Sequence, residues 1–480
     1  MNNYLINLFT KSLLGNKAVH STSYALKWIK EQNRKVNVDI NEVPFSSLKD
    51  WDFSQNSLMH NSGKFFSIDG IRISTNYGEI TDWEQPIINQ PEIGYLGFIT
   101  KEFDGVLHFL VQAKIEPGNI NFVQLSPTLQ ATKSNYSKVH KGNAPAYLNY
   151  FQNVKKEQIL IDQLQSEQGA RFLKKRNRNI IIKIDEELEI LDNFIWLTLS
   201  QIKELMRFDN VVNMDTRTVV SGIPLFESSK INLDQFRHTF PGFSSSNFNE
   251  GLLESCAYDS ENVNSLDDII KFITYQKCKW ELDVCKKPLH SLENWIITDR
   301  NIYHIDNKYF EIIAADIVID NREVVNWSQP MVKPVQEGLC ALICKNINGV
   351  LHFIMQAKLE CGNFDIIELA PTVQCLTDNY RTDSSIEGLP YLKYILNTDK
   401  GKLIFDTFQS EEGGRFYKEQ NRSMIIFDED EIPINLPENY IWMSYNQLQM
   451  FLKHNNYLNI QARSLLSALS FKLAYEETIE

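Results

Sequence analysis

The chain repeats itself after 244 residues, and this internal duplication constrains its fold more than any other feature of the sequence. GVLHF at residues 105–109 returns at 349–353, and QAKIEPGN at 112–119 returns as QAKLECGN at 356–363. The copies align without a gap over residues 44–178 of the first copy, and beyond that the offset becomes 246. A repeat this long exceeds a solenoid unit and fits two tandem domains.

The repeat predicts a first domain over residues 1–240 and a second over 241–480, each with its own hydrophobic core. Pro241, Gly242 and three following serines interrupt the periodic apolar pattern there, as expected of a domain boundary. Each copy mixes short strands and helices in an order unlike a regular βαβ winding. We therefore expect the α+β class.

Local patterns predict individual elements within each copy. Ser265 and Asp268 are typical of a helix start, and the equivalent helix of the first copy is expected near Ser21. The pair Asp104-Gly105 between two apolar runs predicts a hairpin. QSEQGARF, at residues 165–172, is expected to form a helix.

Composition and charge exclude several classes of protein. The chain has 48 basic and 61 acidic residues, a formal charge of -13, and no basic run that would track nucleic acid. No window approaches the roughly 18 apolar residues needed to cross a bilayer. The seven cysteines include no CxxC pair, which favours free thiols in a reducing compartment over a disulfide framework or zinc site. We expect a soluble, cytoplasmic protein without membrane or nucleic-acid partners.

The second strand of the predicted hairpin has one apolar face and one face that becomes polar toward its end. The polar face carries His, Gln, Lys and Glu in both copies, at His108, Gln112, Lys114 and Glu116 and again at His352, Gln356, Lys358 and Glu360. A solvent-facing edge would explain the alternation equally well. The identity of the two copies indicates a shared constraint, either of fold or of ligand geometry.

The chain resembles a known family at this motif and elsewhere. The strings VQAKIEPGNINFVQLSPTLQATKSNYSKVHKG and MQAKLECGNFDIIELAPTVQCLTDNYR are similar to the signature of the NDP-hexose 2,3-dehydratase family. Trp-x-Gln-Pro, QSEQGARF and an Ile-Trp near the end of each copy extend the resemblance over most of the chain. No GxGxxG or GxxxxGK[ST] phosphate-binding motif is present.

The resemblance implies a carbon–oxygen lyase of deoxysugar biosynthesis. Its substrate would be a nucleotide-linked 4-keto-6-deoxyhexose, typically dTDP-4-keto-6-deoxyglucose, which loses water across C2 and C3. It also implies two Nudix-like domains that can each hold a nucleotide sugar, a homodimer, and a downstream 3-ketoreductase or aminotransferase that captures the diketo product. Neither copy contains the carboxylate-rich Nudix box Gx5Ex7REUxEExGU, which argues against metal-dependent pyrophosphate cleavage.

The implied reaction sets requirements that side chains alone can meet. The C3 proton lies alpha to the C4 ketone, so its removal gives an enolate. A base near C3, a donor toward the C4 oxygen and an acid for the C2 hydroxyl are needed, and no cofactor or metal is expected.

The second copy is slightly favoured as the catalytic one, because Glu368 replaces Gln124 and adds a possible base. The candidate catalytic residues are Lys358, Glu360, Tyr380, Glu368 and His352. A hydrogen-bonded core histidine fits His352 as well as a catalytic one does.

Substrate-binding candidates occur in both copies. Those of the first copy are Trp51, Lys114, Glu116, Lys133, Ser134, Asn135, Tyr136, Ser137, Ser166 and Arg171. Those of the second copy are Trp295, Trp327, Gln356, Thr377, Asn379, Arg381 and Arg415. For the tryptophans a core position is the alternative, for the serine a helix cap, and for the charged residues a solvated loop or a surface ion pair.

Two other functions remain open at this point. The chain could be a pair of nucleotide-sugar-binding modules without catalysis, or a diverged Nudix-type hydrolase. The missing carboxylate box argues against the hydrolase, and the polar strand face argues against a purely structural protein.

Overall fold

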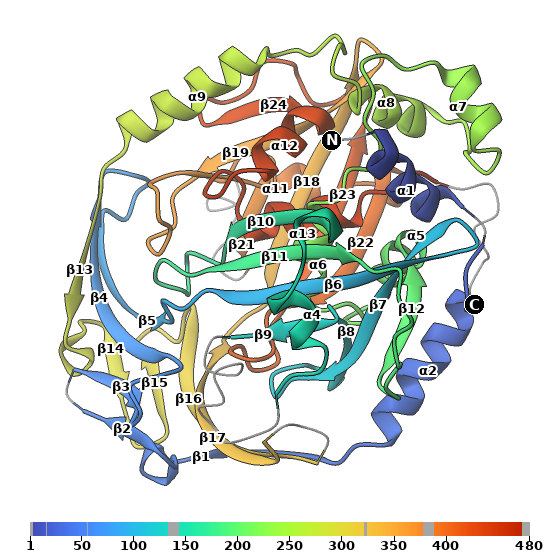
Figure 1. Cartoon of the computed structure of the whole chain (residues 1–480). Coiled ribbons are helices and arrows are strands. Elements are labelled where there is room, and N and C mark those ends of the chain that lie inside the picture. Colours follow the sequence, from blue (N-terminus) through green and yellow to red (C-terminus); the bar gives the residue numbers. More distant parts are fainter. Residues whose placement is uncertain are drawn as a thin grey trace.

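The computed structural model describes residues 3–15, 17–54, 56–132, 144–320, 324–377 and 388–472. Within them the two copies contain the same succession of elements (Figure 1). The first half comprises α1 (Asn3–Leu14), α2 (Thr22–Arg34), β1 (Val38–Val43), β2 (Trp51–Phe53), β3 (Ser57–His60), β4 (Ser67–Thr75), β5 (Asp82–Asn89), β6 (Gly94–Phe103), β7 (Val106–Ile115), β8 (Val123–Ser126), β9 (Leu129–Ala131), α4 (Leu148–Gln152), β10 (Ile159–Ser166), β11 (Arg176–Lys183), β12 (Phe194–Thr198), α5 (Leu199–Leu205) and α6 (Met214–Ser221).

The second half follows α7 (Leu233–Thr239) and repeats this order. It comprises α8 (Asn247–Ser255), α9 (Leu266–Lys279), β13 (Leu282–Lys287), β14 (Trp295–Ile297), β15 (Asn301–His304), β16 (Phe310–Ile319), β17 (Asn326–Pro334), β18 (Gly338–Ile347), β19 (Val350–Lys358), β20 (Glu368–Ala370), β21 (Val373–Leu376), α11 (Leu392–Leu396), β22 (Leu403–Ser410), β23 (Gln420–Asp428), β24 (Tyr440–Ser444), α12 (Tyr445–Leu452) and α13 (Ile460–Ala468). The α+β class is confirmed.

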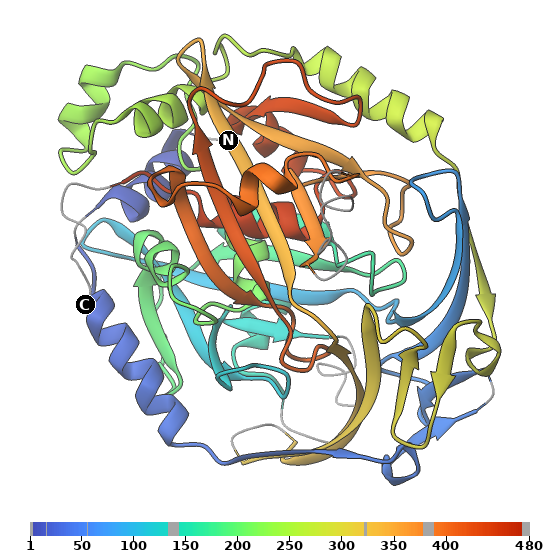
Figure 2. The ribbon, with the colours of Figure 1, turned by 180° about the vertical axis from the view of Figure 1, so that it is seen from behind.

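The two halves exchange one strand each. β1 pairs antiparallel with β16 of the second half, from Val38 opposite Ile319 to Val43 opposite Ala314. β13 pairs in the same way with β4 of the first half. In Figures 1 and 2 the olive β13 lies beside the blue β4, and the blue β1 lies beside the yellow β16. Each five-stranded sheet is therefore completed by the other half of the chain.

Each half also forms a seven-stranded sheet from its own strands. The first has the order β10-β11-β6-β7-β12, with β8 on β7 and β9 on β6, and the second repeats this pairing with β18 to β24. The expected hairpin between β6 and β7 is confirmed, with Asp104 and Gly105 in the left-handed region at φ 49° and 76°.

The helix starts expected from the sequence are also confirmed. Ser21 caps α2 by accepting the Tyr24 N–H, and Ser265 and Asp268 form a capping box at the start of α9.

The helix expected over residues 165–172 is wrong. β10 continues to Ser166, and the residues from Glu167 to Lys175 form a loop that returns the chain to β11. The corresponding loop of the second half runs from Glu411 to Glu419. The loop main chain forms its hydrogen bonds with other segments, for example Ile88 N–H to Arg171 O at 2.9 Å, so a helix is not needed to satisfy it.

The largest hydrophobic core combines residues of both halves, whereas the sequence predicted a separate core in each copy. Helices α6 and α13 pack against each other within it. The buried Arg217 of α6 donates from Nε to Ser464 Oγ at 2.8 Å, and the buried Arg463 of α13 donates from Nε to Thr218 Oγ1 at 3.2 Å. Smaller clusters lie on the outer face of each seven-stranded sheet.

No helix among the described residues is long and apolar enough to cross a membrane. All seven cysteines are free thiols.

Candidate active site

A cavity of about 360 Å³ lies where the end of β7 meets the second half of the chain. The first half contributes Lys49, Asp50, Trp51, His60, Phe65, Phe66, Gln90, Gly94, Leu96, Lys114, Glu116, Pro117, Gln130, Ala131, Thr132, Pro145, Lys175, Asn177 and Asp215. The second half contributes Val324, Asn326, Trp327, Ser328, Gln329, Glu412, Gly414 and Arg415. We call it the composite cavity, because neither half encloses it alone.

A direct contact between two repeated motifs brings the halves together here. The Gly118 N–H donates to Gly413 O at 2.8 Å, and the Lys418 N–H donates to Gly118 O at 2.7 Å. A side chain at Gly118 would collide with the main-chain oxygen of Phe416. QAKIEPGN of the first half thus binds the QSEEGGRF loop of the second half, and the glycine allows the close approach.

The same contact is made in reverse on the other side. The Gly362 N–H donates to Gly169 O at 2.7 Å, and the Lys174 N–H donates to Gly362 O at 2.6 Å. A side chain at Gly362 would collide with Phe172 O. The repeated glycines are therefore explained by the fold, whereas Lys114 and Glu116, which precede Gly118, line the cavity.

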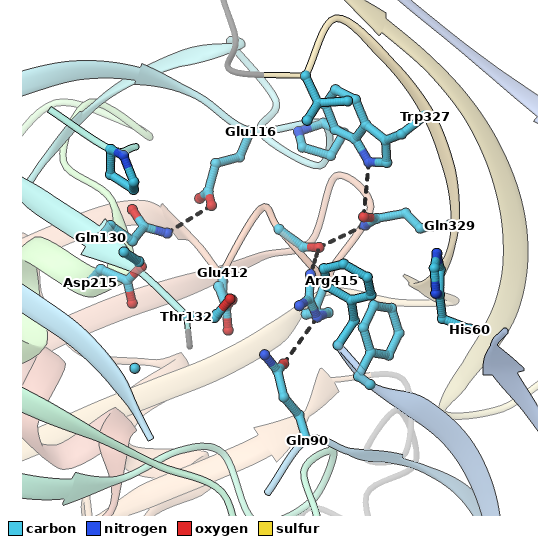
Figure 3. Close-up of a pocket in the computed structure, with 18 of the residues that line it drawn as sticks. His60, Gln90, Glu116, Gln130, Thr132, Asp215, Trp327, Gln329, Glu412 and Arg415 are labelled. Carbon is cyan, nitrogen blue, oxygen red and sulfur yellow. Dashed lines mark hydrogen bonds between the residues drawn. The ribbon is translucent and has the colours of Figure 1, made fainter. Parts of the chain in front are cut away.

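The composite cavity has a polar end, formed by Lys114, Glu116, Gln130, Lys175, Asp215 and Glu412. Gln130 on β9 donates from Nε2 to Glu116 Oε1 at 2.8 Å (Figure 3). Its own oxygen accepts from Ser126 Oγ at 2.9 Å and from Asn213 Nδ2 at 3.2 Å. Because both donors fix the oxygen of the Gln130 amide, its nitrogen must face Glu116, which orients that carboxylate.

Asp215 and Glu412 reach the polar end from opposite halves. Asp215 is the second residue of α6, whose N-cap is Asn213, and its side chain is buried. Burial, followed by the charges of Glu412 and Glu116, raises the pKa of Asp215 well above its usual range. Burial likewise raises the pKa of Glu412 to about 7, although Arg415 opposes the shift.

Two lysines supply positive charge at the same end. Lys114 precedes Glu116 by two residues, so both side chains extend from the same polar face of β7. Lys175 follows the first loop, and its ammonium group donates to the main-chain oxygen of Glu92. Burial lowers the pKa of Lys175, while the charges of Glu167 and Glu412 act in the opposite direction. A partly desolvated cation here is suited to stabilise negative charge on a ligand.

The other side of the composite cavity is its aromatic end, formed by Trp51, His60, Phe66, Trp327 and Arg415. The guanidinium of Arg415 lies 4.1 Å from the centre of the Phe66 ring. It donates from Nε to Gln90 Oε1 at 3.2 Å, and its burial lowers the pKa of Arg415. Figure 3 shows Arg415 and Gln90 across the pocket from Glu116 and Asp215, with Glu412 between them.

The Trp-x-Gln element positions the loop that carries Arg415. Trp327 donates from Nε1 to Gln329 Oε1 at 3.1 Å, and Gln329 donates from Nε2 to Gly414 O at 2.8 Å (Figure 3). Trp51 donates from Nε1 to Ser328 O at 2.8 Å, so it joins the two halves. Both rings still border the cavity and combine a structural hydrogen bond with an exposed aromatic face.

The repeat relates the composite cavity to a counterpart position in the other half. The supporting contacts recur there, with Gln374 donating to Glu360 at 2.9 Å and Asn459 donating to Gln374 at 2.8 Å. The lining residues change, because Gln461 takes the place of Asp215 and Gln168 takes the place of Glu412. Glu419 replaces Lys175 and Pro334 replaces Gln90.

The structure distributes the candidates named from the sequence over several places. Trp51, Lys114, Glu116, Trp327 and Arg415 line the composite cavity. The counterpart position contains the residues that align with four of these, namely Lys358, Glu360, Arg171 and Trp295. The candidates Lys133, Ser134, Asn135, Tyr136, Ser137, Asn379, Tyr380 and Arg381 lie outside the described residues.

The remaining candidates are buried in the framework. His352 accepts the Val263 N–H at Nε2, at 3.1 Å, and its Nδ1 lies 2.9 Å from Val350 O, so both ring nitrogens bind main chain. Glu368 accepts from Ser166 Oγ at 2.9 Å between the halves, and burial raises the pKa of Glu368 to about 7.

Gln356 and Thr377 are also placed away from the composite cavity. Gln356 is buried between Ala370 and Tyr440 in the sheet, and Thr377 donates from Oγ1 to Glu337 O at 2.9 Å.

Asp215, Glu412, Lys175, Gln130 and Gln90 were not among the candidates. Four of these five positions differ between the copies, whereas most of the predicted candidates lie at positions where the copies are identical. A comparison of differences within the aligned repeat would have singled out Asp215 against Gln461 and Lys175 against Glu419.

Comparison with known proteins decides the family. The sequence profile of the family described as NDP-hexose 2,3-dehydratase matches residues 22–223 and 266–469, one segment in each half. The chain belongs to the NDP-hexose 2,3-dehydratase family. It is therefore a dehydratase, a carbon–oxygen lyase, and the resemblance drawn from its motifs is confirmed.

Three curated relatives carry the name dTDP-4-dehydro-6-deoxy-alpha-D-glucopyranose 2,3-dehydratase. The relative from Saccharopolyspora spinosa is 41% identical over 446 residues, which cover 92% of this chain and 90% of the relative. Those from Streptomyces violaceoruber and Amycolatopsis orientalis are 38% and 37% identical, cover 92% of this chain, and are themselves covered to 95% and 89%.

Proposed function

We propose that this dehydratase removes water across C2 and C3 of dTDP-4-keto-6-deoxyglucose in the composite cavity. The relatives' shared name supports the substrate. The observation that carries the choice of site is the cavity itself, which joins a cation with aromatic rings at one end to carboxylates with lysines at the other. A nucleotide sugar has the same division, with its base and diphosphate at one end and its sugar at the other.

In this proposal the nucleoside diphosphate occupies the aromatic end. Arg415 binds the diphosphate, because a desolvated guanidinium gains most from a charge-assisted, bidentate contact. Trp51 and Trp327 offer ring faces to the base or the ribose. The 4-keto sugar then extends to the polar end, where Glu116 can accept a sugar hydroxyl group.

Proton transfer at the polar end accounts for the chemistry. A carboxylate removes the C3 proton, and Lys114 or Lys175 stabilises the charge that develops on the C4 oxygen. A protonated carboxyl group gives its proton to the departing C2 hydroxyl. We place catalysis here rather than among Lys358, Glu360, Glu368 and His352, because the counterpart position has amides where the composite cavity has Asp215 and Glu412.

We infer three finer properties from the family resemblance. Each half is Nudix-like in its fold, two chains form a homodimer, and a 3-ketoreductase or aminotransferase captures the labile diketo product. Sedimentation analysis tests the dimer, and a coupled assay with a ketoreductase tests the capture step.

The function is tested by incubating the protein with dTDP-4-keto-6-deoxyglucose in deuterated water, with and without EDTA. We expect loss of one water by mass spectrometry and deuterium at C2 by NMR, at equal rates in both samples. Saturable binding without turnover would indicate a binding protein instead. Release of dTMP that EDTA abolishes would indicate a Nudix-type hydrolase.

A further inference from the structure

Two carboxyl groups at the polar end of the composite cavity differ from their neighbour Glu116. Glu116 is tethered by Gln130, but Asp215 and Glu412 make no side-chain hydrogen bond to any other described residue. Asp215 is only 3% exposed, and both groups border the cavity. A buried carboxyl group without a protein partner is costly, which indicates that its partner is a ligand or a proton.

The repeat provides an internal comparison for this pair. The supporting network of Glu116, Gln130 and Asn213 recurs as Glu360, Gln374 and Asn459. Asp215 and Glu412, in contrast, both become glutamines. An amide fills nearly the same space as a carboxyl group but can neither bind nor release a proton at neutral pH. The two positions thus differ in proton chemistry while the surrounding scaffold is the same.

We propose that Asp215 and Glu412 act as one catalytic pair, assembled from the two halves, that holds a single proton at rest, gives it to the leaving C2 hydroxyl and accepts a second proton from C3 of the substrate. This proposal rests on the proposed function of the composite cavity. It assigns Asp215 as the acid, Glu412 as the base and Glu116 as a substrate-binding residue.

The charges around the pair favour this division. Asp215 faces Glu412, Glu116 and Glu167, with Lys114 as the opposing cation. Glu412 faces Glu167 and Glu116 but also Arg415 and Lys175. Carboxyl groups whose charges act on one another resist simultaneous ionisation, so one proton is retained. The two cations beside Glu412 favour its ionised form, which leaves the proton on Asp215.

The proton balance closes over one turnover. Glu412 takes the C3 proton, and the C3–H electron pair forms the enolate. As the enolate collapses, the C2–O bond breaks, and Asp215 gives its proton to the leaving hydroxyl to form water. The product at this stage is an enol at C3. Glu412, after exchanging its proton with solvent, protonates C2 while Asp215 takes the enol proton, which gives the 3,4-diketone and restores the starting state.

The test compares Asp215→Asn and Glu412→Gln with Glu411→Gln. Glu411 is the matched control, because it is a buried carboxyl group of the same loop that accepts from Asn421 and does not line the cavity. General acid–base groups contribute about 10²–10⁴-fold to rates. We expect Asp215→Asn to lose at least about 100-fold in water loss while recovered substrate still gains deuterium at C3. Glu412→Gln should lose both reactions, and Glu411→Gln neither.

Binding of dTDP to each variant, measured by calorimetry, checks that the cavity stays intact. The assignment is overturned if either pair variant keeps near wild-type kcat. It is also overturned if saturating substrate restores the rate, because the residue would then only bind. Loss of C3 exchange in Asp215→Asn with exchange retained in Glu412→Gln would reverse the assignment of acid and base.

A second readout needs no turnover. Infrared spectra of protein labelled with 4-¹³C-aspartate at pH 7 should show a protonated aspartate carboxyl that disappears in Asp215→Asn. In Glu412→Gln that signal should titrate at lower pH, because the neighbouring negative charge is gone, and in Glu411→Gln it should not change. If the aspartate signal titrates at the same pH in Glu412→Gln as in the wild type, the two carboxyl groups do not act as a pair. The spectra can show these changes even where the wild-type chain does not dehydrate the sugar. In that case the proposed function is wrong, but the two carboxyl groups still share one proton.

Discussion

The composite cavity and its counterpart position have the same scaffold and different linings. Both contain the Lys-x-Glu strand end, the Gln that orients the Glu, and the close glycine contact between halves. They differ at Asp215 and Gln461, and at Glu412 and Gln168. The contacts that hold the exchanged halves together are alike in the two copies, whereas part of the lining differs. Identity between the copies therefore marks the fold together with the shared Lys, Glu and Arg of the lining, whereas the differences distinguish the two linings in proton chemistry.

The largest expected effect tests the shared scaffold. Gly118→Ala and Gly362→Ala should each lower the free energy of unfolding by about 4 kcal/mol or more, because the new methyl group meets a main-chain oxygen. Gly105→Ala is the control, since no atom lies within 4 Å of its added carbon and only the left-handed backbone costs about 1–2 kcal/mol. Urea unfolding measures all three. A large effect in one half only would contradict a symmetric scaffold.

Arg415 and Arg171 test whether the two linings bind alike. Both guanidiniums lie over a phenylalanine ring, at 4.1 Å and 4.2 Å. Arg415→Met should lower kcat/KM by about 100-fold, because hydrogen bonds to charged groups contribute about 1.5–3 kcal/mol each. Arg171→Met should lower kcat/KM by about tenfold at most. Steady-state kinetics with dTDP titrations decide this, and equal losses would show that turnover depends on both positions.

The ionisation of Glu412 should appear in the pH dependence of stability. Its pKa in the folded protein is about 7, above the ordinary value of 4.5. The folded state therefore binds more protons, and this contribution to stability is present below pH 4.5 and lost as the pH rises through 7. Glu412→Gln should thus be more stable than wild type at pH 8 by up to about 3 kcal/mol.

Chemical denaturation at pH 5 and pH 8 measures this difference. Gln168, which already has an amide, provides the comparison, because Gln168→Asn should show the same offset from wild type at both pH values. An advantage of Glu412→Gln that does not grow with pH would mean that Glu412 is already ionised in the folded protein at pH 5.

Gln90 should give the smallest effect. Gln90→Ala removes the acceptor of Arg415 Nε and should raise KM about fivefold with little change in kcat, as expected for one hydrogen bond of about 1 kcal/mol. Initial-rate kinetics separate the two constants. A fall in kcat at unchanged KM would show that the Gln90 contact matters only in the transition state.

The sequence predicted those features that depend on neighbouring residues or on the repeat. The cap at Ser265, the turn at Asp104-Gly105 and the polar face of β7 follow from local stereochemistry, and the structure has them. The loop at Glu167–Lys175 was predicted as a helix, because its hydrogen-bond partners lie far away in the chain. His352 fitted two interpretations until its ring nitrogens were seen to bind Val263 and Val350.

The sequence by itself determined the duplication, the α+β class and the family, because these are properties of order and identity along one chain. Only the tertiary structure decided that β1 and β13 change places and that Glu412 and Arg415 complete a cavity begun by Lys114 and Glu116. Strand exchange depends on pairing between segments more than 200 residues apart, and no local pattern records which of two equivalent sheets a strand joins. The composite cavity follows from that pairing.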